Sequence, residues 1–346
     1  MSYPRFSDIS RNFAPGWFAA VMGTGVLALT TRSLGQRWPA LAVIAEALHW
    51  FNSALFVLLA VPWLTRWLRF RAAALQTLNH PVQASFYPTF SIALLVLAAQ
   101  WLAFSPCVEV ALTLWWLGVI VHFAFSFAVL FIVFRGEHVG LDHVTPAQFI
   151  PAVGLVVMPL AGGPLLAHMD GALREWALTI NIIGLGAGSM MYLGLFGLAL
   201  HRNYLHKPAP GLLTPTVWIH LAPIGAIPVS LMNVLEQLPY PAAREVATVL
   251  MLLLWGFGVW WLLMASLLTL SARQAGQLPF ALSWWGFTFP IGAFAAESLR
   301  LSQLLGWSST FAIGVAAWLL LCFFWVITLV RTACGVASGA IFQPHS

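Results

Sequence analysis

Charged residues are scarce in this chain of 346 residues: Asp, Glu, Lys and Arg make up 7% of it, whereas soluble domains carry about 25%. Hydrophobic residues make up 61%, and the mean hydropathy is +0.88. A soluble globular domain is therefore excluded. The composition indicates an integral membrane protein surrounded by the lipid bilayer.

Cysteine is also rare, which excludes cysteine-based metal sites and disulfide scaffolds. The three cysteines, Cys107, Cys322 and Cys334, have neither paired nor metal-ligand spacing. We expect them to be small apolar side chains or free thiols.

Histidine patterns typical of metal or haem sites are lacking as well. His138 with His143, and His201 with His206, are pairs five positions apart without an HExxH-like context. The remaining helical candidates are single and fall on different predicted helices: His49, His122 and His220. We therefore expect no metal, no cofactor and no enzymatic activity.

Apolar runs of the length needed to cross a bilayer, roughly 17 to 25 residues, recur along the chain. They predict ten transmembrane helices at 15–31, 40–65, 81–103, 108–134, 146–167, 174–200, 213–235, 242–271, 281–305 and 309–331. The connections between them are short. We therefore expect residues 1–346 to form a single all-α membrane domain with short tails.

The distribution of basic residues predicts the orientation, because cytoplasmic loops carry an excess of Lys and Arg. One side receives Arg5, Arg11, Arg66, Arg69, Arg71, Arg135, Arg202, Lys207, Arg273 and Arg331. The other side receives Arg32, Arg37, Arg174, Arg244 and Arg300. This asymmetry places both termini in the cytoplasm of a protein of the cytoplasmic membrane. It also accounts for the pI of 9.6 without a nucleic-acid-binding patch.

Proline alternates between the predicted helices. It recurs in or at the start of the odd-numbered spans, for example at Pro88, Pro159, Pro223 and Pro290, whereas the even-numbered spans contain only Pro62. Proline removes a backbone hydrogen bond, and the freed carbonyl has no partner in lipid. We therefore expect five hairpins, each with a kinked inner and a smooth outer helix, in a quasi-five-fold arrangement around a central pore.

The predicted inner helices contain small and hydroxyl-bearing residues and almost no formal charge. Residues expected to line the pore are Gly23, Thr24, Gly25, Thr89, Ser91, Thr216, Ser230 and Thr288. A cation pathway would carry Asp or Glu at its middle, whereas this lining favours anions through hydroxyls and helix dipoles. The exception is Glu297, which lies near the outer end of the ninth span.

The pair Phe289–Pro290 suggests a gate. The residue before a proline is disfavoured in helical geometry, so we expect Phe289 to lie on a distorted turn with its ring aimed into the pore. The alternative is that Phe289 packs against a neighbour as an ordinary core residue.

Five segments of the sequence resemble the inner helices of the tellurite-resistance/dicarboxylate transporter family. They are NFAPGWFAAVMGTGV, NHPVQASFYPTFSIALL, TPAQFIPAVGLVVMPLAGGPL, LTPTVWIHLAPIGA and SWWGFTFPIGAF. That family includes plant slow anion channels, bacterial tellurite-resistance proteins, sulfite efflux pumps and malate permeases. The chain is most similar in character to the bacterial tellurite-resistance members.

The resemblance implies a homotrimer in which each subunit has its own pore for small inorganic or dicarboxylate anions. It implies that the aromatic residue of the TFP motif, Phe289, plugs this pore, with Phe287 as the competing assignment. The short tails depart from the plant channels, whose long termini carry phosphorylation control.

Two mechanisms stay open within the family: a passive anion channel, or a proton-coupled transporter of C4-dicarboxylate, sulfite or tellurite. A coupled carrier needs a titratable group in the path, for which Glu297 and His220 are the candidates. The structural interpretation is that Glu297 forms an ion pair with Arg300 one turn away. By the same interpretation, His220 hydrogen-bonds a carbonyl freed by Pro223.

Overall fold

The computed structural model of the chain describes residues 3–80, 82–136, 145–205 and 211–342. Within these ranges every regular element is a helix, so the predicted all-helical class is confirmed. The α-helices are α1 (Phe6–Arg11), α2 (Ala19–Gly35), α3 (Ala40–Arg69), α4 (Arg71–Leu78), α5 (Thr89–Phe104), α6 (Val108–Arg135), α7 (Ile150–Leu165), α8 (Gly171–Leu205), α9 (Leu221–Leu235), α10 (Pro241–Gln274), α11 (Thr288–Leu305) and α12 (Ser308–Ala337). The 3-10 helices are η1 (Pro15–Phe18), η2 (Ala84–Phe86), η4 (Pro146–Phe149), η5 (Leu166–His168), η6 (Gly211–His220), η7 (Leu282–Phe287) and η8 (Ala340–Phe342). His138, His143, His206 and Lys207, and Pro81 of the HPV motif, lie outside the described residues.

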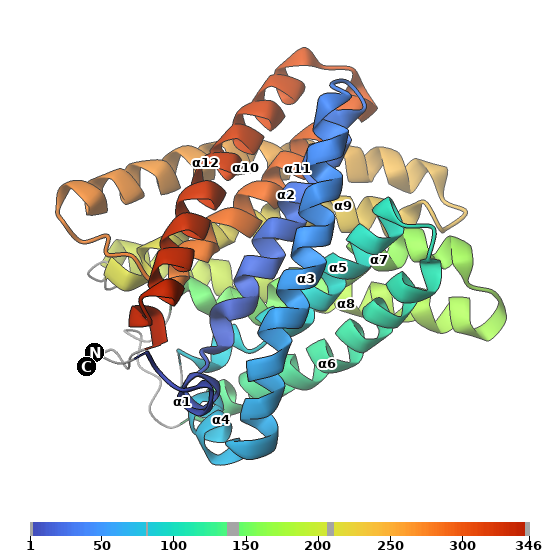
Figure 1. Cartoon of the computed structure of the whole chain (residues 1–346). Helices are drawn as coiled ribbons and strands as arrows, with labels where there is room; N and C mark the ends of the chain where they lie inside the picture. The colour runs from blue at the N-terminus through green and yellow to red at the C-terminus, as the bar shows by residue number, and fades with distance from the viewer. Residues whose placement is uncertain (1–2, 81, 137–144, 206–210, 343–346) are drawn as a thin grey trace.

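Helices that follow one another in sequence pack together as hairpins. α2 packs on α3, α5 on α6, α7 on α8, α9 on α10 and α11 on α12. Figure 1 shows these helices crossing the molecule, with the two chain ends on the same side. The first and last described segments touch there, since Pro4 and Tyr3 lie against Gly339.

Burial separates the helices within each hairpin, as the proline alternation predicts. Buried residues make up 67% of the most apolar stretch of 84–104, 89% of 146–168 and 78% of 211–235. In α3, α6, α8, α10 and α12 the corresponding shares are between 17% and 28%. Most residues of α2 and α11 are buried too. The helices predicted as inner are therefore inside, where protein and not lipid surrounds the interrupted backbone.

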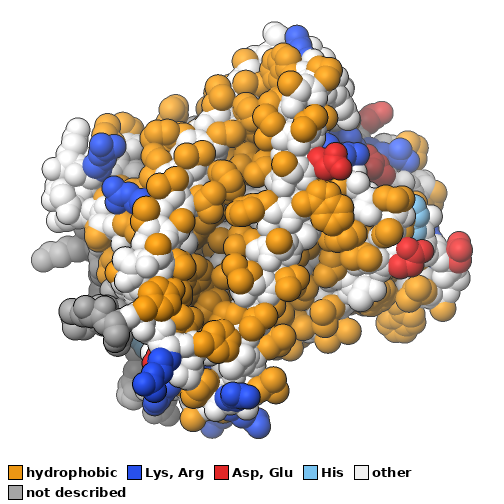
Figure 2. All heavy atoms as spheres, viewed as in Figure 1, with side chains coloured by type: hydrophobic (Ala, Val, Ile, Leu, Met, Phe, Trp, Pro, Cys, Tyr) orange, Lys and Arg blue, Asp and Glu red, His pale blue; other side chains and the backbone are white. Residues whose placement is uncertain are grey.

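The five buried helices contact one another in a closed circuit. α2 packs against α5 and α11, α7 packs against α5 and α9, and α9 packs against α11. The five exposed helices lie outside this circuit, each against its own hairpin partner. Hydrophobic side chains cover most of the face shown in Figure 2, and charged side chains gather toward its margins. Such a surface fits lipid contact.

Eight helices in the described residues are long and apolar enough to cross a membrane, whereas the sequence predicts ten spans. The two others are the segments 15–35 and 282–305, which contain α2 and α11. Both are helical, but Thr, Ser and Gly dilute their apolar residues. A helix enclosed by other helices needs no continuous apolar surface, so these two lack the signal expected of lipid-exposed spans.

Each buried helix begins with a 3-10 turn, and in α5, α7, α9 and α11 a proline lies within three residues of the change to α-helix. Pro88 precedes α5, whereas Pro223 and Pro290 occupy the third positions of α9 and α11. Proline is tolerated in a first turn because its missing N–H would have had no partner there. The break expected at Pro290 is therefore this change of helix type one turn upstream, and Phe289 itself is α-helical.

Candidate functional site: a vestibule at the ends of the buried helices

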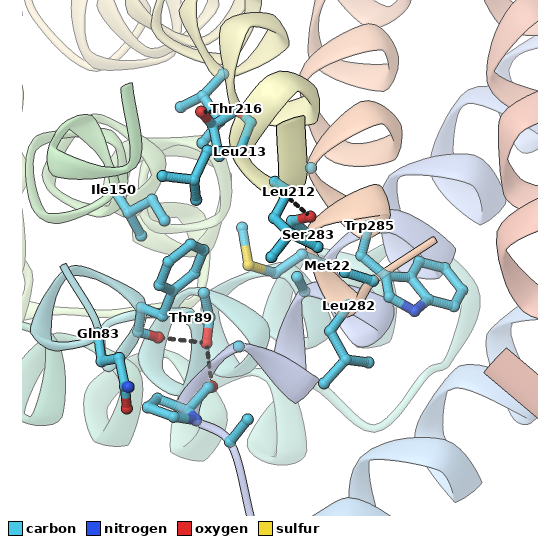
Figure 3. Close-up of a pocket in the computed structure, with 18 of the residues that line it drawn as sticks. Met22, Gln83, Thr89, Ile150, Leu212, Leu213, Thr216, Leu282, Ser283 and Trp285 are labelled. Atoms are coloured by element: carbon cyan, nitrogen blue, oxygen red, sulfur yellow. Dashed lines mark hydrogen bonds between the residues drawn. The ribbon is translucent and has the colours of Figure 1, made fainter. Parts of the chain in front are cut away.

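A cavity of about 720 Å³ lies where the starts of the five buried helices meet. We call it the vestibule; its lining comes from within residues 12–22, 83–89, 150–153, 212–222, 280–290 and 335–342, and from Thr77. In Figure 3 the side chains of Met22, Thr89, Ile150, Thr216 and Trp285 surround this space from five separate chain segments. The fold thus brings the five inner-helix motifs to one site.

The helix starts give the vestibule a positive electrostatic character. In α2, α5, α7, α9 and α11, and in the 3-10 turns before them, the first turn contains no acidic residue. No side chain caps the N-terminus of these five α-helices. Among the exposed helices, α6 has Glu109 in its first turn, whereas α3, α8, α10 and α12 also lack an acidic residue there. The positive ends of five helix dipoles therefore converge without neutralisation.

The hydroxyl groups of the vestibule are engaged with the backbone. Thr89 Oγ1 lies 2.9 Å from the Pro15 carbonyl and 2.7 Å from the Phe86 carbonyl, and Thr216 donates to Leu213 O at 2.6 Å. Ser283 donates to the Leu212 carbonyl, and Figure 3 shows these contacts. Since these hydroxyls use their hydrogens on carbonyls, they leave lone pairs for the cavity. None of the described lining residues is charged, so attraction for anions must come from the helix ends or from behind the wall.

The two phenylalanines considered for the gate lie on different sides of their helix. Phe289 lines the vestibule, and its side chain is 5% exposed. Phe287 is fully buried, stacked on Phe324 with ring centroids 4.3 Å apart and edge-on to Trp218 at 5.7 Å. Of the two, the geometry brings Phe289 to the cavity.

The predicted lining residues of α2 lie at helix contacts. A Cβ atom added to Gly23 would lie 1.9 Å from Oγ1 of Thr288, and one added to Gly25 would lie 2.3 Å from Val96. Thr24 Oγ1 accepts a hydrogen bond of 2.9 Å from the indole of Trp325. These residues join α2 to α11, α5 and α12, respectively.

The remaining predicted hydroxyls and prolines divide between the vestibule and the helix packing. Thr89 and Pro290 line the cavity together with Phe289 and Thr216. Thr288 donates to Trp285 O at 2.8 Å, and Ser91 donates to Pro88 O at 2.8 Å. Ser230 donates across to the Val156 carbonyl of α7. Residues placed outside the vestibule lining are Gly23, Thr24, Gly25, Pro88, Ser91, Pro159, Pro223, Ser230 and Thr288.

The expected ion pair between Glu297 and Arg300 is wrong. Arg300 pairs instead with Glu236 at the end of α9, at 2.7 Å, with both side chains over a third exposed. Glu297 is fully buried, and neither of its oxygens has a hydrogen-bond partner in the described part of the chain. A carboxyl group on an inner helix is thus left without the partner that the spacing suggested.

The expected hydrogen bond of His220 is also wrong. The ring is buried with neither nitrogen bonded to any described residue. Aromatic rings surround it, with centroids 4.4 Å away for Trp261, 4.5 Å for Phe149 and 5.3 Å for Phe196. The next turn contains Pro223, but the histidine projects into this aromatic cluster.

The other two helical histidines are separate from His220, as expected. Nδ1 of His122 lies 2.9 Å from Ser91 Oγ and Nε2 lies 2.9 Å from the Pro151 carbonyl, which ties α6 to α5 and α7. His49 stacks on Phe104 with centroids 5.0 Å apart. Across the described residues, no three His, Cys, Asp or Glu side chains come together to hold a metal ion.

One residue beside the vestibule was missed by the sequence reasoning. The sequence predicts Arg66 only as one of the basic residues on the cytoplasmic side. In the structure it is 2% exposed and donates hydrogen bonds to segments of the vestibule wall. Its position in the aromatic run WLTRWLRF, between Trp63 and Trp67, was the available signal. An arginine within an aromatic helix face is a candidate for burial.

Comparison with known proteins places this architecture in a family. The family model described as voltage-dependent anion channel matches residues 12–333. An uncharacterized transporter of Methanocaldococcus jannaschii is 42% identical over 338 residues, which cover 98% of this chain and 97% of the relative.

More distant relatives have substrates in their names. A sulfite efflux pump of Arthroderma otae is 26% identical, over 84% of this chain and 82% of its own length. A malic acid transport protein of Schizosaccharomyces pombe is 21% identical, over 92% of this chain and 77% of its own length. The resemblance drawn from the five helix motifs is thus confirmed: the chain belongs to the voltage-dependent anion channel family of integral membrane transporters.

Proposed function

We propose that the protein conducts small anions passively through a pore ringed by α2, α5, α7, α9 and α11, with the vestibule as its cytoplasmic mouth and Phe289 as its gate. The observation that carries the proposal is that Phe289 lines a cavity at which five uncapped helix N-termini converge. An electropositive mouth closed by an apolar ring is the arrangement that a gated anion pathway needs.

The chemistry of the mouth suits conduction. An ion that is to move rapidly must be attracted but held weakly. Helix dipoles attract anions over a broad region, and no described lining residue offers a fixed cation that would hold one tightly. The hydroxyls are already bonded to carbonyls, so they add little to the binding of an anion.

The position of Phe289 supports its proposed role as an aromatic gate. Its ring lines the cavity but is almost fully covered, so we take it as the constriction that closes this side of the cavity. A narrow apolar constriction stops ions because they cannot shed their hydration water. Displacement of one ring would widen the path without any rearrangement of the helices.

The proposal extends to the membrane topology. The segments 15–35 and 282–305 join the eight apolar helices as spans, which gives ten crossings with both termini in the cytoplasm. The last turns of α3, α6, α8 and α10 contain basic residues of the predicted cytoplasmic side: Arg66, Arg69, Arg135, Arg202 and Arg273. The chain passes from these helix ends to the starts of the buried helices around the vestibule, in accord with the positive-inside rule. We place the protein in the cytoplasmic membrane as a homotrimer, as the family resemblance implies; the mass of the detergent-solubilised complex tests this assembly.

Two kinds of anion are candidates. Small inorganic anions such as chloride, nitrate and sulfite suit a weakly binding path. The names of the fungal relatives add sulfite and malic acid, and a cavity of about 720 Å³ has room for a dicarboxylate.

A proton-coupled carrier is the second candidate, and Glu297 is the observation that favours it. This carboxyl group is buried on α11 without a hydrogen-bond partner among the described residues. Ionisable groups inside membrane proteins are often functional, because their burial is costly. His220 is the other buried group of this kind.

Flux in liposomes that contain only this protein tests the proposal. We expect chloride, nitrate and malate to move down their gradients at rates that an imposed pH gradient does not change. Uphill malate uptake driven by the pH gradient, with little chloride current, would replace the channel with the carrier. Empty liposomes and liposomes with heat-denatured protein are the controls for leakage.

A further inference from the structure

Arg66 is a buried cation at the end of α3, next to the wall of the vestibule. Its side chain is 2% exposed. Nη1 donates to the Phe13 carbonyl at 2.7 Å, and Nη2 donates to the Ala73 carbonyl at 3.0 Å and to Thr77 Oγ1 at 2.8 Å. These acceptors belong to the segment before η1 and to α4, so the guanidinium connects three parts of the cytoplasmic side.

No carboxylate of the described chain pairs with this cation. The ion pair that the described residues form is the exposed one between Arg300 and Glu236. The groups around the guanidinium of Arg66 are neutral: two carbonyls, the Thr77 hydroxyl, and Tyr87, whose hydroxyl lies 2.6 Å from that of Thr77. An arginine stays protonated in proteins, so a full positive charge is buried with only dipoles around it.

The charge lies directly behind the vestibule. Thr77, which accepts one of its hydrogen bonds, lines the cavity, and so do Asn12 and Ala14 on either side of Phe13. The field of a charge in surroundings of low polarity is weakly screened, and a cleft focuses it. Mobile counter-ions in the cavity are therefore separated from this charge only by the residues of the cavity wall that it contacts.

We propose that Arg66 is the fixed charge that concentrates anions in the vestibule and so helps to set anion over cation selectivity. This inference rests on the proposed conduction of anions. It makes Arg66 a specificity-determining residue that acts through the wall, without contact with the ion. Small anions of any chemical identity are affected, because the charge acts through the electrostatic potential in the cavity and not through direct contacts with the ion.

Conductance as a function of salt separates this role from a merely structural one. The screening length is about 30 Å at 0.01 M salt and about 3 Å at 1 M, so the charge acts at low salt and is masked at high salt. In planar bilayers with potassium chloride, we expect Arg66→Gln to lower anion conductance roughly three- to tenfold at low salt and little at high salt. The reversal potential in a salt gradient should shift toward cation permeation.

Matched variants control for folding and for charge. Arg66→Lys keeps the charge and should follow wild type at both salt concentrations. Arg69→Gln removes an exposed arginine one turn further along α3 and should leave the salt dependence unchanged. Since Arg66→Gln can fail to fold, Thr77→Asp places a carboxylate beside the guanidinium and neutralises it in place, with Thr77→Asn as its uncharged control.

The outcomes are distinct. A loss of anion conductance at low salt in Arg66→Gln, or in Thr77→Asp relative to Thr77→Asn, supports the role of the charge. Equal losses of anion conductance at all salt concentrations, seen in Arg66→Lys as well, overturn the role of the charge. Arg66 would then only hold the surrounding segments together. Unchanged conductance in Thr77→Asp also overturns the role of the charge. Wild-type protein that conducts no anions refutes the proposed function instead.

Discussion

The side-chain amide of Asn233 in α9 donates to the carbonyl of Leu160 in α7, with Nδ2 and O 3.2 Å apart. That carbonyl would bond to the N–H of the residue four positions later in an unbroken helix, but that residue is Pro164. Asn233 also lies 3.3 Å from the Pro159 carbonyl. α9 thus supplies to α7 a hydrogen bond that Pro164 removes, so the interruption of one inner helix is compensated by its neighbour.

Replacement of Asn233 by Leu should destabilise this contact. It leaves the Leu160 carbonyl unsatisfied at a partly buried contact. Loss of such a bond costs about 1–3 kcal/mol where the group is fully buried, and about 0.6–2 kcal/mol by membrane-protein precedent, which is the expected range here. The thermal unfolding midpoint of the protein in detergent measures this loss. Asn203→Leu, at an exposed position of α8, is the matched control and should change the midpoint little. Equal midpoints for the two variants would contradict the role of Asn233.

Gly23 should be intolerant of even one methyl group. A Cβ atom there would lie 1.9 Å from Oγ1 and 2.7 Å from Cβ of Thr288, so α2 and α11 would have to separate. Overpacking of this kind costs about 1–3 kcal/mol. Gly256 of α10 has no atom within 4 Å of the same position, so Gly256→Ala should instead stabilise its helix by up to about 1 kcal/mol. Opposite shifts of the unfolding midpoint are the expected result, and a harmless Gly23→Ala would disprove the close contact.

Much of the fold was predictable because proline and hydrophobicity report burial in a membrane. The alternation of prolines separated inner from outer helices, since a free carbonyl cannot face lipid. α2 and α11 fall within predicted spans as well, although they are enclosed by protein and their Thr, Ser and Gly weaken the apolar signal that marks lipid-exposed helices.

Partners across helices were beyond the reach of sequence spacing. The i, i+3 rule paired Glu297 with Arg300, but Arg300 reaches Glu236, 64 positions earlier in the chain. Arg66 looked like one of many cytoplasmic arginines, and only the fold places it behind the vestibule. Spacing reports neighbours on one helix surface, whereas these contacts depend on how helices meet.

Glu297→Gln separates the two candidate mechanisms. The substitution keeps the shape of the side chain and removes its ability to carry a proton. For a passive channel we expect the anion flux of the variant to stay within about twofold of wild type, a difference of under about 0.5 kcal/mol. An imposed pH gradient should change the flux of neither protein. Glu236→Gln, at an exposed position, is the control. Loss of gradient-driven malate uptake in Glu297→Gln alone would establish a coupled carrier.

Phe289→Ala should open the pore. The ring lines the vestibule. If it closes the path as we propose, its removal should raise anion conductance at least about tenfold, equivalent to about 1.4 kcal/mol of barrier. Phe287→Ala is the matched control two positions away. Its ring stacks on Phe324 inside the protein, so the change should cost about 3–5 kcal/mol of stability without raising conductance per folded molecule.

Residues two positions apart on a helix point to nearly opposite sides, so one of the two phenylalanines faces the path while the other packs against α12. Liposome flux normalised to folded protein decides between them, with Phe289→Leu and Phe287→Leu as milder versions. A rise in Phe287→Ala with none in Phe289→Ala would move the gate to the other ring and leave the vestibule as its mouth.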